Sequence, residues 1–173
     1  GHLKCCKLLL ARGADPNFED TKRGTALMAA ASAGNPECVS ALLAAGAALN
    51  ARRLVDASNA LYFACHAGHT ECARLLLEAG AARGWKNSRG LTPLMAVVEG
   101  AGRALQGLVH ADKKRLESVD KQKDARRRYK ACLQVVLRHE PNLETTTING
   151  STPLIVAAGR SDIDFVRMLL SAG

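Results

Sequence analysis

Hydrophobic residues in this chain are grouped in short segments that are separated by polar, glycine-containing stretches. Four of the segments align with one another, as RGTALMAAASAGN, ASNALYFACHAGH, RGLTPLMAVVEGA and NGSTPLIVAAGRS. Their central leucines are Leu27, Leu61, Leu94 and Leu154, which are 34, 33 and 60 residues apart. Self-similarity at a period of about 20 to 50 residues is typical of proteins whose units bury their apolar faces against their neighbours. The pattern therefore predicts a stack of similar units rather than one globular core.

A second set of apolar segments follows the first and ends in glycine, as in LLLARGADPN, ALLAAGAALN and LLLEAGAARG. Thr92-Pro93 and Thr152-Pro153 have the form of helix starts, with threonine as the N-cap and proline in the first turn. Glycines stand where a left-handed residue would end a helix, at Gly13, Gly46 and Gly80. Each unit is therefore predicted to contain a short helix, a tight turn, a longer helix and a glycine stop.

The segments GLTPLMAVVEGAG and GSTPLIVAA, with the recurring LLxxGA, resemble ankyrin repeats over nearly the whole chain outside residues 102–128. The resemblance implies an all-α ankyrin-repeat solenoid of stacked helix-turn-helix units with hairpin-like fingers. By this register, residues 1–17 are a partial repeat, and 18–50, 51–84, 85–144 and 145–173 are repeats with both helices. We therefore expect the chain to be a fragment of a longer ankyrin array.

The spacing between Leu94 and Leu154 exceeds one period by 27 residues, which predicts a helical insertion at about 102–128 in the third full repeat. The turn between the two helices of this repeat is expected at Gly100–Gly102, followed by a short amphipathic helix. The second helix is expected to begin near Ser118 or Asp120 and to project from the stack by two or more additional turns.

The formal net charge is +8, and residues 103–130 contribute most of it, with ten Lys or Arg against four Asp or Glu. This segment is either a solvated helical extension or an electrostatic arm formed by Lys113, Lys114, Arg115, Arg126, Arg127 and Arg128. Such an arm would bind nucleic acid or an acidic surface through the basic inserted helix 110–130. Nucleic acid is the less favoured partner, because Tyr129 is the segment's one aromatic residue and single-strand binding uses several stacking platforms.

Cysteines recur at one position of successive repeats, as Cys5, Cys38, Cys72 and Cys132. Repeats stack roughly 10 Å apart, so this ladder is too extended for one tetrahedral zinc site or for disulfides. We interpret the cysteines as small buried residues and expect no metal and no cofactor. No nucleophile and base can be paired by register, and no phosphate-binding glycine loop follows a strand, so the sequence does not predict an enzyme.

Composition places the chain among ordinary globular proteins, with 47% hydrophobic and 23% charged residues. No apolar run approaches the roughly 18 residues of a membrane helix, and no signal peptide is visible, so membrane insertion is not expected. Six cysteines without secretory spacing favour a reducing compartment. A cytoplasmic location is therefore expected, with a nuclear one as the alternative, and the sequence makes no prediction of the oligomeric state.

The family resemblance implies that partners bind in the concave groove formed by the fingers and the inner helices. Carried over by register, the residues expected to contact a partner are Phe18, Lys22, Arg52, Arg53, Leu54, Phe63, His66, Trp85, Lys86, Arg89, Glu99 and Arg160. Trp85 is the expected anchor, because large amphipathic side chains concentrate binding energy. The arginines and Lys86 would make the middle of the groove basic, which favours a partner protein or peptide with acidic and apolar residues. The chain is therefore predicted to be a non-catalytic protein-protein interaction scaffold.

Overall fold

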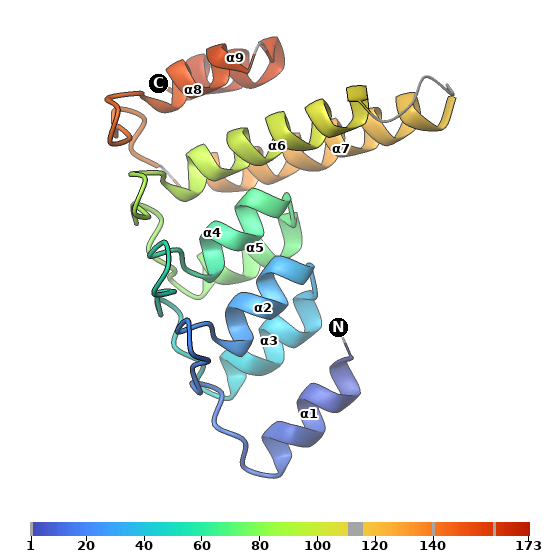
Figure 1. The fold of residues 1–173 in the computed structure, drawn as a ribbon, viewed down its shortest axis with the longest axis vertical. Helices are drawn as coiled ribbons and strands as arrows, with labels where there is room; N and C mark the ends of the chain where they lie inside the picture. Colours follow the sequence, from blue (N-terminus) through green and yellow to red (C-terminus); the bar gives the residue numbers. More distant parts are fainter. Residues whose placement is uncertain (1, 111–115, 140, 161) are drawn as a thin grey trace.

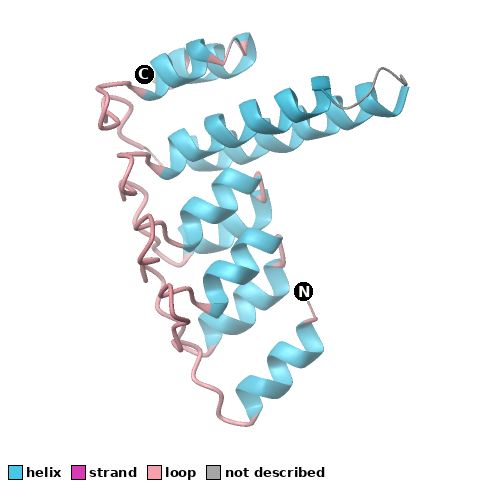
Figure 2. Cartoon of the chain, viewed as in Figure 1, coloured by secondary structure: helices cyan, strands magenta, loops and turns pink. Residues whose placement is uncertain are grey.

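The computed structural model describes residues 2–110, 116–139, 141–160 and 162–173, with side-chain positions outside 106–119. Over these residues the chain forms nine α-helices and no strands. The helices stack in two layers into an elongated array (Figure 1). Figure 2 shows that the loops gather along one edge of the array. The predicted all-α repeat solenoid is confirmed.

Inner and outer helices alternate along the chain. The inner layer consists of α2 (Ala26–Ala33), α4 (Ala60–Ala67), α6 (Pro93–His110) and α8 (Pro153–Gly159). The outer layer consists of α1 (Leu3–Ala11), α3 (Pro36–Ala44), α5 (Thr70–Glu78), α7 (Leu116–Leu137) and α9 (Ile163–Leu170). Each inner helix packs on the next inner helix, and α1, α3, α5 and α7 pack in the same order on the outer side. Stacking of this kind buries a continuous core from units that have none of their own.

The inner helices begin at the same kind of residue in every repeat. A side-chain oxygen at the N-cap accepts a hydrogen bond from the backbone N–H three residues later, at 2.9 to 3.4 Å. The four caps are Thr25, Asn59, Thr92 and Thr152. This bond satisfies one of the N–H groups that lack a partner in the first turn of a helix. The predicted starts at Thr92-Pro93 and Thr152-Pro153 are thus confirmed.

The inner helices α2 and α4 end at Gly34 and Gly68, which adopt left-handed backbone angles with φ of 72° and 71°. In the next repeat the same register position is Ala101, and α6 continues to His110. Alanine is the best helix former and disfavours the left-handed conformation, so the stop signal is missing. The predicted turn at Gly100–Gly102 is therefore wrong, and the predicted short amphipathic helix is the continuation of α6.

The glycines around Ala101 allow close packing instead of a turn. A Cβ atom on Gly100 would lie 1.9 Å from the backbone oxygen of His66, so α6 approaches the end of α4 more closely than any side chain permits. The same oxygen accepts a hydrogen bond from the Tyr129 hydroxyl of α7 (3.0 Å). Gly100 and Tyr129 therefore fix the lengthened repeat onto its neighbour.

The outer helix α7 is 22 residues long, whereas α3 and α5 have nine each. It begins at Leu116, close to the predicted start, and packs along α6 as the two helices project from the stack on the side away from the loops (Figure 1). Ion pairs connect it to the start of α9, between Arg126 and Asp162 (3.7 Å) and between Lys130 and Asp164 (2.5 Å). The expected extension of this helix is thus present, and part of it is bound to the last repeat.

The core lies between the two layers. The central leucines of three repeats, Leu27, Leu61 and Leu94, are fully buried, whereas Leu154 of the last helix pair is 37% exposed. Cysteines at the predicted ladder position are buried in α3, α5 and α7, and all six thiols of the chain are free. Cys5 is exposed, contrary to the prediction, because its helix α1 packs chiefly on α3 and contains no buried residue.

Candidate partner-binding groove

Each loop along the edge of the array is a short finger closed at its base by a backbone hydrogen bond. In the first finger the bond runs from Asp20 N–H to Gly24 O (3.0 Å), and in the third from Asn87 N–H to Leu91 O (3.0 Å). Oδ1 of Asp20 and of Asn87 also accepts two backbone N–H bonds from the turn that follows. These side chains therefore hold the turn shape that the backbone alone would not fix.

The fingers are bonded to one another. Backbone hydrogen bonds connect successive fingers, from Leu54 N–H to Lys22 O (2.8 Å), from Ser88 N–H to Asp56 O (2.9 Å) and from Ile148 N–H to Arg89 O (3.2 Å). Side chains add further links, since Asn17 Nδ2 donates to Gly46 O (3.1 Å) and Asn50 Oδ1 accepts from Ala82 N–H (2.9 Å). The fingers therefore form one connected wall beside the inner helices.

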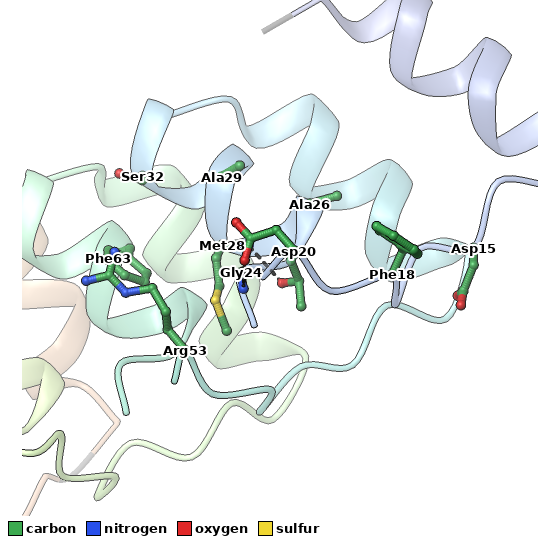
Figure 3. A pocket seen from close by; sticks show the side chains of 11 residues that line it. Asp15, Phe18, Asp20, Gly24, Ala26, Met28, Ala29, Ser32, Arg53 and Phe63 are labelled. Carbon is green, nitrogen blue, oxygen red and sulfur yellow. Dashed lines mark hydrogen bonds between the residues drawn. The ribbon is translucent and has the colours of Figure 1, made fainter. Parts of the chain in front are cut away.

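An open hollow of about 510 Å³ lies where the first finger meets α2 and the second repeat. Figure 3 shows Phe18 at one end of it and the side chains of Arg53 and Phe63 at the other, with Ala26 and Ala29 between them. Phe18 is one of the three phenylalanines of the chain, and it is 75% exposed. Phe18, Arg53 and Phe63, all predicted to contact a partner, thus line a single groove with both apolar and polar side chains.

Trp85 packs on the preceding finger. Its Nε1 donates to the backbone oxygen of Ala57 (2.9 Å), and the guanidinium of Arg52 lies 4.6 Å from the ring centroid. The ring is half-buried by these contacts. The predicted anchor is therefore held rigidly between two fingers, and the exposed Arg52 is stacked on it by a cation-π contact.

Arg53 joins the second finger to α4. Its guanidinium forms two hydrogen bonds with the Asp56 carboxylate, at 3.0 and 2.5 Å, and lies 4.9 Å from the centroid of the Phe63 ring. Burial acts to raise the pKa of Asp56, but the hydrogen bonds from Arg53 and Ser58 outweigh it and the pKa is lowered. Asp56 therefore stays ionised and neutralises Arg53 in the groove.

Two further arginines share one carboxylate on α6. Glu99 Oε1 accepts from Arg89 (3.0 Å) and from Arg103 (2.8 Å), and Oε2 accepts from Arg89 (2.6 Å). Arg89 also donates to the Tyr62 hydroxyl (3.4 Å), and the Tyr62 ring stacks on His66 with centroids 5.9 Å apart. The third finger, α4 and α6 therefore meet in one polar cluster, formed by these five residues.

The cluster lowers the pKa of Glu99 and of His66, which favours the charged form of the first and the neutral form of the second. Burial acts to raise the pKa of Glu99, but hydrogen bonds and charge from Arg89, and the charge of Arg103, lower it overall. Burial and the positive charges of Arg103 and Arg89 lower the pKa of His66. At neutral pH, Glu99 is therefore an anion and His66 a neutral ring that adds no charge of its own.

The other predicted contact residues lie on the same face but are not all brought together. Lys86 Nζ donates to Thr146 O of the next finger (2.9 Å), and Lys22 and Leu54 are exposed on the first and second fingers. Arg160, at the end of α8, lies over Gly102 of α6. The middle of the groove is less basic than the sequence suggests, because Asp56 and Glu99 pair with two of its arginines.

The basic arm predicted from the sequence is described only in part. Lys113, Lys114 and Arg115 lie outside the described residues. Arg126 is directed to Asp162, whereas Arg127 and Arg128 are exposed on α7. One face of this segment is buried, since Ala125 and Tyr129 pack into the stack.

Sequence reasoning missed the partners that organise the groove. Asp56, Tyr62 and Arg103 were not singled out, yet each bonds with a predicted contact residue. The spacing of Glu99 and Arg103, four residues apart on one helix, is a signal that could have found that ion pair. The pairing of Arg89 with Glu99 joins a finger to a helix, and local sequence carries no signal for it.

Among the described residues no group of three or more His, Cys, Asp or Glu is placed to hold a metal ion. In that same part of the chain no helix is long and apolar enough to cross a membrane.

Comparison with known proteins bears on the whole array. A family model for ankyrin repeats in three copies matches residues 1–81 and 46–118, and a model for a single ankyrin repeat matches residues 149–173. Among the curated proteins, no sequence matches the chain. Ankyrin repeats generally mediate protein-protein interaction, and proteins built from them are typically non-catalytic. The family models cover most of the chain and agree with the stacked helix pairs, so the chain belongs to the ankyrin repeat family.

Proposed function

We propose that this chain is a non-catalytic scaffold that binds a partner protein or peptide along its concave surface of fingers and inner helices. One observation carries the proposal: the open hollow between Phe18 and Phe63, in which a large aromatic ring is left exposed beside other apolar side chains. Isolated exposed apolar residues are ordinary, but aromatic rings that line a concave surface are typical of binding sites.

Rigidity of the groove supports the same function. The fingers are bonded to each other through backbone and asparagine contacts, and Trp85 is fixed by a hydrogen bond to Ala57. A surface that is already ordered loses less conformational entropy when a partner binds. The groove therefore needs little rearrangement to accept an extended segment.

The chemistry of the surface favours a partner segment that carries both apolar and acidic residues. The hollow at the first finger is lined by apolar side chains such as Phe18, Met28 and Phe63, and also by Asp15 and Asp20. Farther along, Arg52, Lys86 and the Glu99 cluster present positive charge. A partner segment with apolar and acidic residues fits this order, with its apolar part in the hollow.

The test uses random peptides displayed on phage, selected against the chain, and then measured by fluorescence anisotropy. A Phe18→Ala variant is expected to lose on the order of tenfold in affinity for the selected peptides, because an exposed anchor is truncated. Ile163→Ala, which truncates a similarly exposed residue on α9 outside the groove, is the matched control and should bind normally. Equal affinity of both variants would show that the groove is not the binding surface.

Electrostatic binding through the basic helix 110–130 is the alternative. It has less support, because Arg126 and Lys130 form ion pairs with α9. Counterion release makes binding to nucleic acid strongest at low salt. A duplex DNA probe that stays unbound at low salt would therefore eliminate the nucleic-acid form of this alternative. Retained binding of a selected acidic peptide by a variant that combines Lys113→Gln, Lys114→Gln, Arg115→Gln, Arg127→Gln and Arg128→Gln would eliminate the acidic-surface form.

A further inference from the structure

The strongest charge arrangement on the concave side is the sharing of one buried carboxylate by two exposed arginines. The Glu99 side chain is 7% exposed, and it accepts hydrogen bonds from Arg89 and Arg103 at 2.6 to 3.0 Å. In the described part of the chain, the ion pairs of both arginines go to this one carboxylate. One negative charge therefore faces two positive charges, and the cluster keeps a net positive charge.

The convex side provides a contrast within the same molecule. On α5, Arg74 lies between Glu71 and Glu78 and bonds with both. There one guanidinium is shared by two carboxylates, so the local charge is negative. The pairing around Arg74 thus has the opposite charge balance from the Glu99 cluster.

The arginines of the Glu99 cluster are fixed but not covered. Their side chains are 49% and 54% exposed, while their bonds to Glu99, and that of Arg89 to Tyr62, hold the guanidinium planes in place. A guanidinium has five N–H donors in a planar fork, and these contacts use only some of them. The donors that these contacts leave over are accessible to a ligand, because both side chains are about half exposed.

A third arginine increases the charge of this surface. Arg160 of α8 lies over Gly102, and a Cβ atom on that glycine would come within 2.7 Å of the Arg160 side chain. Gly102 is buried, three residues from Glu99 and next to the exposed Arg103 on α6. The absence of a side chain at Gly102 therefore lets Arg160 approach the cluster from the next repeat.

We propose that Arg89 and Arg103, held by Glu99 and supplemented by Arg160, form a carboxylate-binding site that receives an Asp or Glu side chain of the partner segment. This site rests on the proposed function of the concave surface and adds a specific requirement to it. The partner carries an acidic residue about one to two repeats along from the residue that occupies the Phe18 hollow.

Carboxylate is favoured over phosphate by the charge balance. The planar fork of arginine pairs with two oxygens of a carboxylate or of a phosphate alike, so charge decides between the two groups. Glu99 stays ionised beside the site, so an incoming group with a single negative charge meets less repulsion than a phosphate that carries nearly two. A neutral His66 and the Tyr62 hydroxyl border the site without adding charge.

The first test needs no partner. The Nε–Hε resonances of the arginines are followed by NMR while sodium acetate replaces sodium chloride at constant ionic strength. Arg89 and Arg103 are expected to shift by more than Arg74, whose side chain is 40% exposed and lies between two carboxylates. Shifts of Arg89 and Arg103 no larger than that of Arg74 would overturn the site. This outcome is independent of whether any peptide binds in the hollow.

The second test uses the phage-selected peptides. They are expected to be enriched in Asp or Glu, and Arg103→Gln should weaken their binding on the order of tenfold, because one charge-assisted contact is lost. Arg103→Gln leaves the Arg89 to Glu99 bonds in place, so the buried carboxylate keeps a partner. Arg74→Gln is the matched control and should bind as the parent chain does.

The outcomes separate this inference from the proposed function. Peptides that bind in a Phe18-dependent way, without acidic residues and without an effect of Arg103→Gln, would overturn the carboxylate site and leave the groove intact. Tighter binding of a peptide in which phosphoserine replaces the acidic residue would overturn the assignment to carboxylate. Failure to select any peptide would count against the groove, and the acetate titration would then decide the carboxylate site alone.

Discussion

Single residues determine where backbone strain occurs in the fingers. Arg23 and Ala57 adopt positive φ angles of 58° and 54°, at the register position that Gly90 and Gly150 fill in the other two fingers. A Cβ atom in the left-handed region is disfavoured by about 1–2 kcal/mol. The first two fingers therefore hold a strained turn that the other two avoid.

Replacing Ala57 by glycine is expected to stabilise the chain. The variant removes the Cβ atom that disfavours the left-handed conformation, which stabilises the folded state. Glycine also has more conformational entropy in the unfolded chain, which opposes folding, so the net gain is expected to be up to about 1 kcal/mol. The free energy of unfolding from urea denaturation measures the effect. Ala79→Gly, at a residue with φ of −74°, is the control and should be destabilising. A loss of stability in both variants would refute the strain at Ala57.

Two half-buried histidines are expected to make stability depend on pH, His66 beside the groove and His69 in the turn between α4 and α5. Burial is the main cause that lowers the pKa of His66 and of His69 in the folded chain. Between the lowered pKa and the ordinary value near 6.5, the unfolded chain binds more protons than the folded one. The free energy of unfolding is therefore expected to be full above about pH 6.5 and to fall as the pH is lowered below it.

Urea denaturation at about pH 7.5 and about pH 5.5 tests this dependence on the two sides of the ordinary histidine pKa. A His66→Gln variant should lose part of the difference between the two pH values, because one of the two groups no longer titrates. Equal pH dependence of the variant and the parent chain would show that His66 is not responsible. Arg89, Arg103, Glu99 and Tyr62 face His66 and are unchanged in this comparison.

Pairs of helices are positioned by the residues at their ends and by close backbone contacts. In α2 and α4, a glycine in the left-handed conformation ends the helix, and alanine at the same position lets α6 continue. The close contact between α6 and α4 depends on Gly100, where no side chain fits. Helix length and helix spacing in this repeat therefore follow from adjacent residues with different roles.

A Gly100→Ala substitution is expected to reduce the free energy of unfolding by at least about 2 kcal/mol, because the new methyl group overlaps the backbone oxygen of His66. Thermal and urea denaturation measure the loss. Gly84→Ala is the matched control, because a Cβ atom there meets nothing within 4 Å, and its effect should stay within about 0.5 kcal/mol. Similar losses in both variants would mean that helix propensity or loop effects, rather than the contact, dominate.

Local signals predicted most of the fold, and contacts between elements explain what they missed. Caps such as Thr92 and stops such as Gly46 act within one turn, so the sequence shows them directly. Gly100 and Gly102 have the composition of a turn but serve contacts with His66 and Arg160, which are distant in sequence. The register placed Phe18 and Phe63 correctly on one surface, whereas the pairing of Arg89 with Glu99 depends on how a finger folds back onto a helix.

At the scale of the whole array, the last described repeat carries exposed apolar side chains. Leu154 is partly exposed, and Leu170 is 62% exposed beside a small hollow that Leu143 and Leu169 also line. The described helices place no layer over this face. Exposed apolar faces of stacked repeats promote association, which a polar terminal surface prevents.

Leu170→Lys is expected to reduce self-association of the chain at high concentration and to leave the melting temperature within a few degrees of the parent value, because Leu170 contributes little to the core. Sedimentation velocity over a concentration series measures the association. Leu54→Lys, on a finger tip and similarly exposed, is the control. If it lowers association as much as Leu170→Lys does, the open face of the last repeat is not the contact.

The lengthened pair α6 and α7 also determines which part of the groove stays formed the longest. In a stack held by nearest neighbours, the repeat with the largest interfaces exchanges its amide hydrogens most slowly. Glu99 and Arg103 lie on α6, and Arg89 lies in the finger that leads into it. Hydrogen exchange is therefore expected to be slowest in α6 and α7. The arginines that would bind a partner's acidic residue are thus carried by the part of the array that opens least often, so this contact needs no folding step during the encounter.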